Sequence, residues 1–356
     1  MSHDEPVNGV PRHRPTMRDV AALSGVSLKT VSRVVNFESG VSPDLIARVR
    51  SAAQILDFQP NLTASSLRRS DGKTKTIGLL LENVANPFSS ALHRAIEIVA
   101  RDRGVVVFAG SVDEDQTRER DLAAAFVARR VDGLIVVPAG HDQSYLATER
   151  RNGTPMVFVD RPPTLLDADA VLTANQVGSR DAVRHLISHG HRRIACVGDL
   201  ASISTAAERL AGYVEALDRA DIAKDPDLIR QGIRSSEAAQ EAVRELLQLP
   251  DPPTAIFASQ NLITIGAIRA LRAASRHHQV ALVGFDDVPL VDLLDPGITL
   301  VLQDVVGMGA AAAELLFRRL DGDDGPTERR IFDARLVPGG SGEIAGPWPT
   351  TNADRA

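Results

Sequence analysis

Polar side chains suited to hydrogen-bonding a small molecule stand at the ends of several apolar runs in the sequence. Asp160 and Arg161 end the run 156–159, and Asp286 ends the run 280–285. In open α/β sheets, ligands bind outside the carboxyl ends of the strands. Carboxylates and an arginine fork are suited to vicinal hydroxyls. Further candidates follow other apolar runs or lie on the next helix: Asn86, Phe88, Arg209, Gln260 and Gln303.

Each candidate also has a purely structural interpretation. A polar residue after a strand can cap the next helix or form a salt bridge between two parts of the fold. Phe88 can pack against a sugar ring, and we expect the set to bind a small molecule. The structural roles stay open for each residue taken alone.

Patterns for catalysis or metal binding are lacking. Four potential zinc ligands have the wrong spacing for a standard site: His185, His189, His191 and Cys196. Gly72-Lys73-Thr74 has Leu67 where a phosphate-binding loop needs its first glycine. The acidic stretches 113–115 and 321–324 are predicted to be solvated loops. We therefore expect a protein that is not an enzyme and that has no cofactor and no metal.

The composition bounds the architecture that must position these residues. At 356 residues, the chain suggests two or three domains. Only 4% of residues are aromatic, so the cores must be mostly aliphatic, and a single cysteine excludes an internal disulfide framework. No run approaches the ~20 apolar residues of a membrane span. Residues 1–16 lack the apolar stretch of a secretory signal, which predicts a cytoplasmic protein.

From Thr76 onward, short apolar runs alternate with helical stretches. This alternation is typical of parallel sheets covered on both faces. The number of runs predicts two similar α/β lobes rather than one. The predicted strands lie at 77–81, 105–109, 133–137, 156–160, 171–173, 194–197, 228–231, 255–258, 280–285 and 299–302. The predicted helices lie at 87–103, 114–130, 142–151, 176–189, 204–220, 236–248 and 261–274.

Charge is distributed unevenly along the chain. The net charge is −6, yet residues 12–73 contain ten Lys or Arg and five Asp or Glu, which gives +5 there and −11 elsewhere. A basic segment on an acidic body is typical of a nucleic-acid-binding head on a regulatory body, although a solvated basic surface would look the same.

The basic segment has the pattern of a helix-turn-helix. Helices are predicted at 17–24, capped by Thr16, at 27–36, and from Ser42-Pro43-Asp44 to about residue 57. Ala21, Gly25 and Val31 match the contact, turn and packing positions of the motif. The second helix would then lie in the major groove. Its base-reading candidates are Leu28, Lys29, Thr30, Ser32 and Arg33. A three-helix bundle of another function remains the alternative.

Eleven ordered motifs extend this pattern along the chain. They are Met17-Arg18-Asp19-Val20-Ala21, Ser24-Gly25-Val26-Ser27, Thr30-Val31-Ser32-Arg33-Val34-Val35-Asn36, Val41-Ser42, Pro60-Asn61, Ile77-Gly78, Asn86-Pro87-Phe88, Val159-Asp160-Arg161, Gly190-His191-Arg192-Arg193-Ile194, Arg209-Leu210-Ala211-Gly212-Tyr213 and Val283-Gly284-Phe285-Asp286-Asp287. With these motifs the chain resembles the lactose-repressor (LacI/GalR) family of bacterial transcriptional regulators over about residues 16–338.

The resemblance implies an all-α helix-turn-helix head with a hinge helix, followed by a periplasmic-binding-protein-like α/β body of two parallel-sheet lobes. The corresponding segments are a disordered tail 1–15, a DNA-binding domain 16–60, a hinge and linker 61–75, an effector-binding and dimerisation domain 76–338, and a disordered tail 339–356. Leu67 matches the leucine that wedges into the central minor-groove step. DNA contacts are implied at Thr16, Ser27, Leu28, Lys29, Thr30, Ser32, Arg33, Asn36, Asn61, Ala64 and Leu67.

In the cleft, the resemblance implies effector contacts at Asp160, Arg161, Arg209, Gln260, Asp286 and Gln303. Two places depart from the family pattern. Gln260-Asn261 and Ala174-Asn175 stand where many members carry Asn-Asp and Asp-Asn. Both changes remove an acidic residue, which puts an ordinary hexose effector in doubt.

The function expected from these features is a repressor that binds a pseudo-palindromic DNA operator as a homodimer. A small-molecule effector in the cleft, of a sugar type, would change operator affinity. Control of the same fold by a protein partner or a non-sugar metabolite is the alternative. Two alternatives belong to other functional classes: a pure solute-binding protein and an α/β enzyme. The first is disfavoured by the basic head and the second by the missing catalytic residues.

Overall fold

The computed structural model describes residues 14–36, 38–59 and 73–349. The chain forms two compact units, Met1–Thr74 and Lys75–Ala356. The expectations for Asn61, Ala64 and Leu67, for the hinge helix and for the outer parts of both tails concern residues outside the described ranges. None of the described helices is long and apolar enough to cross a membrane.

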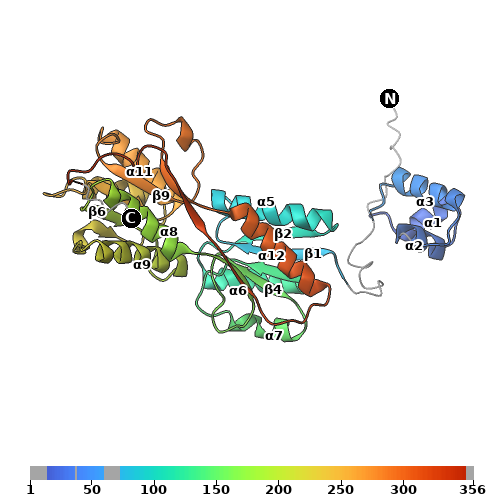
Figure 1. Ribbon diagram of the computed structural model, residues 1–356. Helices are drawn as coiled ribbons and strands as arrows, with labels where there is room; N and C mark the ends of the chain where they lie inside the picture. Colours follow the sequence, from blue (N-terminus) through green and yellow to red (C-terminus); the bar gives the residue numbers. More distant parts are fainter. Residues whose placement is uncertain (1–13, 37, 60–72, 350–356) are drawn as a thin grey trace, which may run out of the picture. The chain divides into compact units, whose positions relative to one another are not determined.

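The N-terminal unit contains three helices, α1 Met17–Ser24, α2 Leu28–Val35 and α3 Pro43–Ile55 (Figure 1). Local sequence sets their ends. The Thr16 backbone N–H donates to the Asp19 carboxylate over 2.7 Å, and the Ser27 hydroxyl accepts from the Thr30 N–H over 3.1 Å. Side-chain acceptors of this kind satisfy the unpaired N–H groups at a helix start. The predicted bounds of α1 are confirmed.

The turn between α1 and α2 requires glycine. Gly25 has φ +64°, a left-handed conformation that side chains disfavour. A Cβ at this position would also lie 2.9 Å from a guanidinium nitrogen of Arg48, which donates to the Ser24 carbonyl over 2.6 Å. Val20 and Val31 are fully buried against α3 residues. The predicted roles of Gly25 and Val31 in the motif are therefore confirmed.

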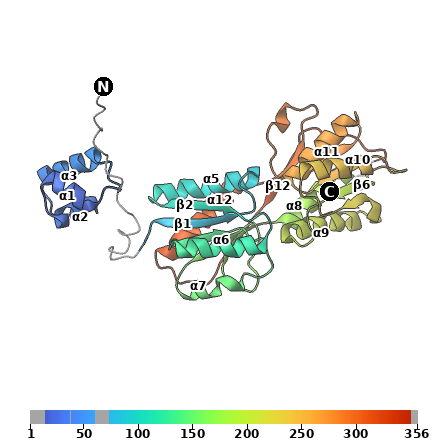
Figure 2. The ribbon, with the colours of Figure 1, turned by 180° about the vertical axis from the view of Figure 1, so that it is seen from behind.

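The C-terminal unit consists of two lobes, each built on a six-stranded sheet (Figures 1 and 2). In the first lobe the strand order is β11-β5-β4-β3-β1-β2, and the strands are β1 Thr76–Leu81, β2 Val106–Ser111, β3 Gly133–Val136, β4 Met156–Val159, β5 Asp169–Thr173 and β11 Arg329–Phe332. In the second lobe the order is β12-β10-β9-β8-β6-β7, and the strands are β6 Ile194–Val197, β7 Ile229–Arg230, β8 Ala255–Ala258, β9 Ala281–Phe285, β10 Thr299–Gln303 and β12 Ala334–Val337.

Helices cover both faces of each sheet. In the first lobe, alternate residues of one strand pack on opposite layers: Leu79 packs with α5 and α12, and Leu80 packs with α6. The first-lobe helices are α5 Pro87–Asp102, α6 Gln116–Ala128, α7 Ala147–Arg151 and α12 Val305–Leu320, with a 3-10 turn η1 Ser144–Leu146. The second-lobe helices are α8 Asn175–Ser188, α9 Ser204–Arg219, α10 Ser236–Leu246 and α11 Asn261–Ala273, with 3-10 turns η2 Pro226–Leu228 and η3 Val291–Leu293.

The structure corrects the predicted elements in four places. One is helix α12, which was not predicted. Strands β11 and β12 were not predicted, and β12 pairs antiparallel with β10. Their burial alternates between partly buried and exposed residues, so they lack the continuous apolar run that marks the inner strands. The predicted helix 142–151 is a 3-10 turn followed by the five-residue α7.

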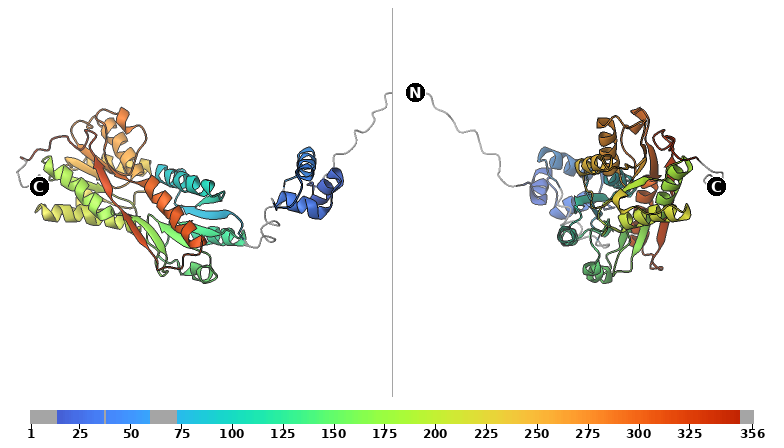
Figure 3. Two further views of the ribbon diagram at one scale, coloured as in Figure 1. Left: turned by 45° about the vertical axis from the view of Figure 1, so that its right-hand side comes forward. Right: turned by 90° about the vertical axis from the view of Figure 1, so that its left-hand side faces the viewer.

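Three chain crossings connect the lobes, between β5 and α8, between β10 and α12, and between β11 and β12 (Figure 3). Hydrogen bonds join the crossing segments to one another. The Ala174 N–H donates to the Phe332 carbonyl over 2.9 Å, and the Thr173 hydroxyl bonds the Gln303 side-chain oxygen. We call the crossing segments that contain Thr173, Ala174, Gln303 and Phe332 the hinge strands. Any change in the angle between the lobes must be taken up by these segments.

The predicted disordered tail 339–356 is wrong for its first eleven residues, Gly339–Pro349. Ser341 is buried, and its hydroxyl donates to the Leu282 carbonyl over 2.6 Å. The Gly346 and Trp348 N–H groups donate to the His189 and Gly190 carbonyls. The composition is rich in Gly and Pro because this segment follows the lobe surface closely, not because it lacks partners.

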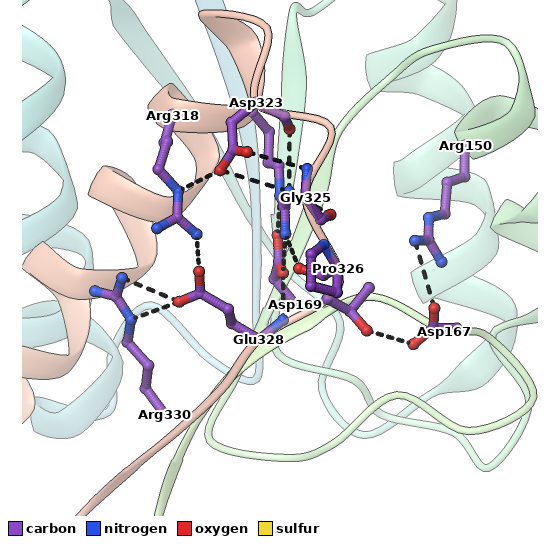
Figure 4. Close-up of polar contacts among 11 residues, drawn as sticks. Arg150, Asp167, Asp169, Arg318, Asp323, Gly325, Pro326, Glu328 and Arg330 are labelled. Carbon is purple, nitrogen blue, oxygen red and sulfur yellow. Dashed lines mark hydrogen bonds and ion pairs between the residues drawn. The ribbon is translucent and has the colours of Figure 1, made fainter.

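A charged network closes the first lobe where β5 begins (Figure 4). Arg319 of α12 makes two hydrogen bonds, of 2.8 and 2.9 Å, to the buried Asp169 carboxylate. The same guanidinium donates to the carbonyls of Asp323, Gly325 and Pro326. Arg319 therefore holds the turn between α12 and β11 against the sheet. Residues 321–324 were predicted to be a solvated loop. That prediction is wrong for Asp323, which takes part in this network.

Candidate DNA interface and ligand cleft

Helix α2 presents one polar face. Val31 and Val34 are buried in the three-helix core, whereas Leu28 is 45% exposed and Lys29 is exposed. An apolar residue left exposed in the first turn of a short helix is available to contact a partner. The N-terminal residues of a recognition helix are the ones that reach base edges in the major groove. The predicted readers Leu28 and Lys29 are thus on the accessible face.

Other predicted DNA contacts are engaged within the unit. The Arg33 guanidinium donates to the Ser39 carbonyl and lies 3.6 Å from the Glu38 carboxylate. The Asn36 amide donates to the Ser32 hydroxyl over 3.2 Å. Arg33 has to exchange these partners before it can bond a guanine. Thr16 is exposed at the start of α1, and Thr30 is partly buried.

All eight predicted effector residues line a single cleft in the C-terminal unit. Its central space is about 80 Å³. The first lobe contributes Asn86, Phe88, Asp160 and Arg161, the second contributes Arg209, Gln260 and Asp286, and Gln303 lies at a crossing. The carboxyl ends of the inner strands of both sheets meet here, as the strand-end rule requires. The fold therefore brings all eight predicted residues together in one cleft.

Arg209 is the most strongly constrained group in the cleft. It lies on α9, is 5% exposed, and its guanidinium carbon is 3.8 Å from the centre of the Phe285 ring. Its Nε donates to Asn175 over 2.8 Å, and its Nη1 donates to the Ser259 carbonyl and, over 3.2 Å, to Asp286. A planar guanidinium held on an aromatic ring presents a fixed fork.

The first lobe contributes a second arginine. Arg161 forms a bidentate pair with Glu114, with distances of 2.6 and 2.7 Å, and also donates to the Pro138 carbonyl. Burial opposes the charge of the guanidinium, yet Glu114 and Asp160 together raise the pKa of Arg161 above its ordinary value. Glu114 was predicted to lie in a solvated loop. That prediction is wrong, because the Glu114 side chain is only 6% exposed and faces the cleft.

Asp160 is buried and lies beside Arg161 at 3.5 Å, with no hydrogen bond to its carboxylate from the described residues. Burial raises the pKa of Asp160. The charges of Asp286 and Glu114 add to this increase, while those of Arg161 and Arg209 oppose it. A buried carboxylate without a donor carries a desolvation cost that a bound hydroxyl or amine would relieve.

The two lobes are bonded directly across the cleft. The Asn261 amide on α11 donates to the Asn86 side-chain oxygen at the start of α5 over 2.7 Å. The Arg234 guanidinium donates to the Asp113 carbonyl over 3.1 Å. These contacts hold the lobes in their present arrangement.

Gln260 occupies one of the positions that depart from the family pattern. Its side-chain oxygen accepts from the Leu262 N–H, and its amide donates to Asp199 over 2.9 Å. Gln260 therefore caps α11 and fixes Asp199 at the cleft. At the second departure, Ala174 precedes α8 without a side-chain cap, and Asn175 bonds Arg209 instead.

Five charged or amide residues that line the cleft were not predicted as effector contacts: Glu82, Glu114, Asp199, Arg234 and Asn261. The strand-end rule could have found most of them. Glu82 directly follows β1, and Asp199 lies two residues after β6. The histidines of the rejected zinc site are structural. His191 is buried and bonds Thr254 and the Ile344 carbonyl. Among the described residues, no three His, Cys, Asp or Glu side chains converge on a metal position.

Comparisons with known proteins agree with this geometry. Residues 16–61 match the bacterial regulatory proteins of the lacI family, and residues 183–342 match a periplasmic binding protein-like domain. The chain is 30% identical over 328 residues to the HTH-type transcriptional repressor CytR of Escherichia coli (strain K12), which covers 92% of this chain and 96% of that protein.

Two solved structures extend the likeness to the fold. The transcriptional regulator CelR in complex with cellobiose is 31% identical with a TM-score of 0.68, over 92% of this chain and all of that one. The lac repressor dimer bound to operator and the anti-inducer ONPF is 26% identical with a TM-score of 0.80, over 94% of this chain and all of that one. The chain belongs to the lacI family of bacterial regulatory proteins and is a DNA-binding transcriptional regulator.

Proposed function

We propose that this regulator is a homodimeric repressor whose affinity for a pseudo-palindromic operator is set by a small polyhydroxylated molecule in the cleft. One observation carries the proposal. Eight residues predicted from strand ends and family positions, drawn from both lobes, line one cavity. A ligand that bonds both lobes changes the balance between their arrangements by its differential affinity for them.

A continuous set of hydrogen bonds joins the cleft to the hinge strands. Arg209 bonds Asp286, and Asp286 accepts from the Gln303 amide over 2.5 Å. Gln303 in turn bonds Thr173 at the first crossing. A ligand that competes for the Arg209 fork or the Asp286 carboxylate therefore acts on the residues where the lobes pivot. Coupling of this kind is typically ~1–3 kcal/mol.

The relatives support the classes of partner. CytR is named as a repressor, and the lac repressor structure is a dimer on operator DNA. Cellobiose is bound in CelR. Because its target is bacterial DNA, the regulator would act in the cytoplasm. The candidate wedge Leu67 would unstack the central operator step from the minor groove. Leu67→Ala should then weaken operator binding far more than binding to random DNA.

The experiment begins with selection of DNA sites from a random pool by the full-length protein. We expect a two-fold symmetric site, because two heads need two half-sites. Fluorescence anisotropy on that site, with and without a panel of sugars and nucleosides, then identifies the effector. Enrichment of asymmetric sites only would contradict the dimeric proposal.

Arg209→Lys provides the matched variant. It keeps the charge beside Asp286 but removes the planar fork. We expect wild-type operator affinity and a loss of the effector response. An unchanged response of the Arg209→Lys protein would contradict the placement of the effector against Arg209. Arg244→Lys, on the exposed face of α10, is the control.

A further inference from the structure

We infer that the effector carries a positively charged amine, and that the amine binds between Glu82, Glu114 and Asp199 at one end of the cleft. This inference rests on the proposed function and specifies the chemistry of its ligand. The class that fits is an amino sugar or a comparable polyhydroxylated amine. Its hydroxyls would face Asp286 and Arg209, and its amine would face the acidic end.

The lining of the cleft carries an excess of negative charge. It contains five carboxylates, from Glu82, Glu114, Asp160, Asp199 and Asp286, against three guanidinium groups, from Arg161, Arg209 and Arg234. Two of the guanidinium groups already have partners within the protein. Arg161 is occupied by Glu114 and Arg209 by Asn175, Ser259 and Asp286. An uncharged sugar would leave this excess uncompensated in a site with limited solvent.

The excess negative charge is concentrated at one end of the cleft, and the strand order explains why. Glu82 follows β1 and Glu114 follows β2, which are the last two strands at one edge of the first sheet. Asp199 follows β6, which lies next to the corresponding edge of the second sheet. Gln303 ends β10 and Asp286 directly follows β9, and these two strands lie toward the opposite edge of the second sheet. The acidic end is therefore distinct from the hinge end, where Arg209 pairs with Asp286.

Glu82 is the carboxylate without a partner. Among the described residues, no hydrogen bond or ion pair is made by its side chain, whereas Glu114 pairs with Arg161 and Asp199 accepts from Gln260 and the Leu200 N–H. Partial burial and repulsion from Glu114, Asp199 and Asp113 raise the pKa of Glu82 to about 7, against the attraction of Arg161. Burial and Glu114 raise the pKa of Asp199 as well.

A second, independent observation points to a ligand that donates hydrogen bonds. Asp160 lines the same cavity, is only 8% exposed, and receives no hydrogen bond from the described residues. Its nearest cation is Arg161, whose Nε is buried and also without a hydrogen bond. A buried acceptor of this kind normally has a partner in a complete site. Donors on a bound polyhydroxylated amine would supply it.

A metal ion is a poorer occupant than an amine. No three His, Cys, Asp or Glu side chains of the described residues converge on a metal position. An ammonium group needs only two or three acceptors, at hydrogen-bond distance and in no fixed polyhedron.

The test uses thermal unfolding of the full-length protein at pH 7. The compounds are glucosamine, galactosamine and mannosamine, each with its N-acetyl derivative and its parent hexose. We expect at least one amine to raise the unfolding midpoint by a few degrees, as a ligand near 100 times its Kd does. Its neutral counterparts should shift the midpoint less. If no amine exceeds its own neutral counterparts, the inference is overturned.

Glu82→Gln tests the same end of the cleft without relying on the choice of compound. The variant removes an unpartnered charge, so we expect its ligand-free midpoint at pH 8 to rise by a few degrees. The exposed Glu241→Gln on α10 should leave the midpoint unchanged. Glu82→Gln should also lose at least tenfold in amine affinity while keeping affinity for neutral sugars. A midpoint equal to wild type, or an unchanged amine preference, counts against the inference.

The outcomes separate this inference from the proposed function. In one outcome, neutral sugars shift the midpoint and release operator DNA, and amines bind no better. That result would support the proposed function and contradict the inference that the effector is an amine. An amine that binds through Glu82 but leaves operator affinity unchanged would retain the acidic subsite and contradict regulation through the cleft.

Discussion

Asp160 and Asp286 occupy the same place in the two lobes. Each directly follows an inner strand, β4 or β9, has φ +70° and is 8% exposed. Each backbone N–H donates over 2.9 Å to a carbonyl of the neighbouring strand, that of Val171 or Val301. The left-handed conformation turns each carboxylate out of its strand into the shared cleft. The fold thus repeats itself at the binding site, although no repeat is visible in the sequence.

The bond between Asn86 and Asn261 predicts a measurable lobe equilibrium. Asn261→Ala removes a 2.7 Å hydrogen bond that crosses the cleft. A net hydrogen bond is worth ~1 kcal/mol, so the ratio of open to closed lobes should rise about fivefold. Small-angle scattering on the ligand-free body, or distance measurements between labels on α6 and α10, would detect the change. Identical distributions for variant and wild type would show that the contact does not hold the lobes.

Arg33 predicts a change in base selectivity. Its guanidinium donates to the Ser39 carbonyl and lies near the Glu38 carboxylate, so bonding a base requires an exchange of these partners. Arg33→Ala should reduce discrimination at one base pair by ~1–3 kcal/mol, or about 5- to 150-fold. Anisotropy on the selected operator and on single-base variants would measure it. Equal losses on all sequences would instead assign Arg33 to the phosphate backbone.

The network around Arg319 predicts a stability loss. Arg319→Met leaves the Asp169 carboxylate buried without its cation, which should lower the free energy of unfolding by about 3 kcal/mol. Calorimetry of the full chain would report the change as a drop in the midpoint of several degrees. Arg94→Met, which breaks an exposed pair with Glu97 on α5, should have no measurable effect. Equal effects of the two substitutions would refute the role of the network.

The lowered pKa of Glu343 predicts how the free energy of unfolding decreases at acidic pH. Although partial burial opposes it, hydrogen bonds from His185, Thr299 and the Gly340 N–H lower the pKa of Glu343 to about 2. A lowered carboxyl pKa stabilises the fold above pH 4.5, and this contribution is lost as the pH falls from about 4.5 toward 2.

The matching variant is Glu343→Gln. Allowing for solvent screening, it should cost ~1 kcal/mol at pH 7 and flatten the fall in stability between pH 4.5 and pH 2. Urea unfolding at a series of pH values would measure both. A variant curve parallel to that of wild type through this range would contradict the lowered pKa.

Much of the architecture could be predicted because the strong signals are local. The turn at Gly25 and the caps at Thr16 and Ser27 depend on residues within a few positions of one another. Buried strands such as β4 and β9 are continuous apolar runs, so the polar residues that follow them could be placed at the cleft. These rules brought Asp160 and Asp286 to one site.

What could not be predicted depends on contacts distant in sequence. Strands β11 and β12 are half-exposed and gain their pairing from segments more than 30 residues away. Glu114 lies in an acidic stretch that composition assigns to solvent, and only the fold brings Arg161 to it. The Gly-rich segment after β12 is ordered by β9 and the end of α8, which its own sequence does not reveal.

The three crossings have a consequence for how such regulators change specificity. Each lobe is assembled from separate stretches of the chain, because α12 and β11 return to the first lobe after most of the second has been completed. A ribosome must therefore deliver nearly the whole chain before either sheet is complete. A single genetic crossover between two relatives cannot exchange one intact lobe for another. A crossover at one point therefore mixes parts of both lobes, and the cleft between them is inherited intact only when both lobes come from the same parent.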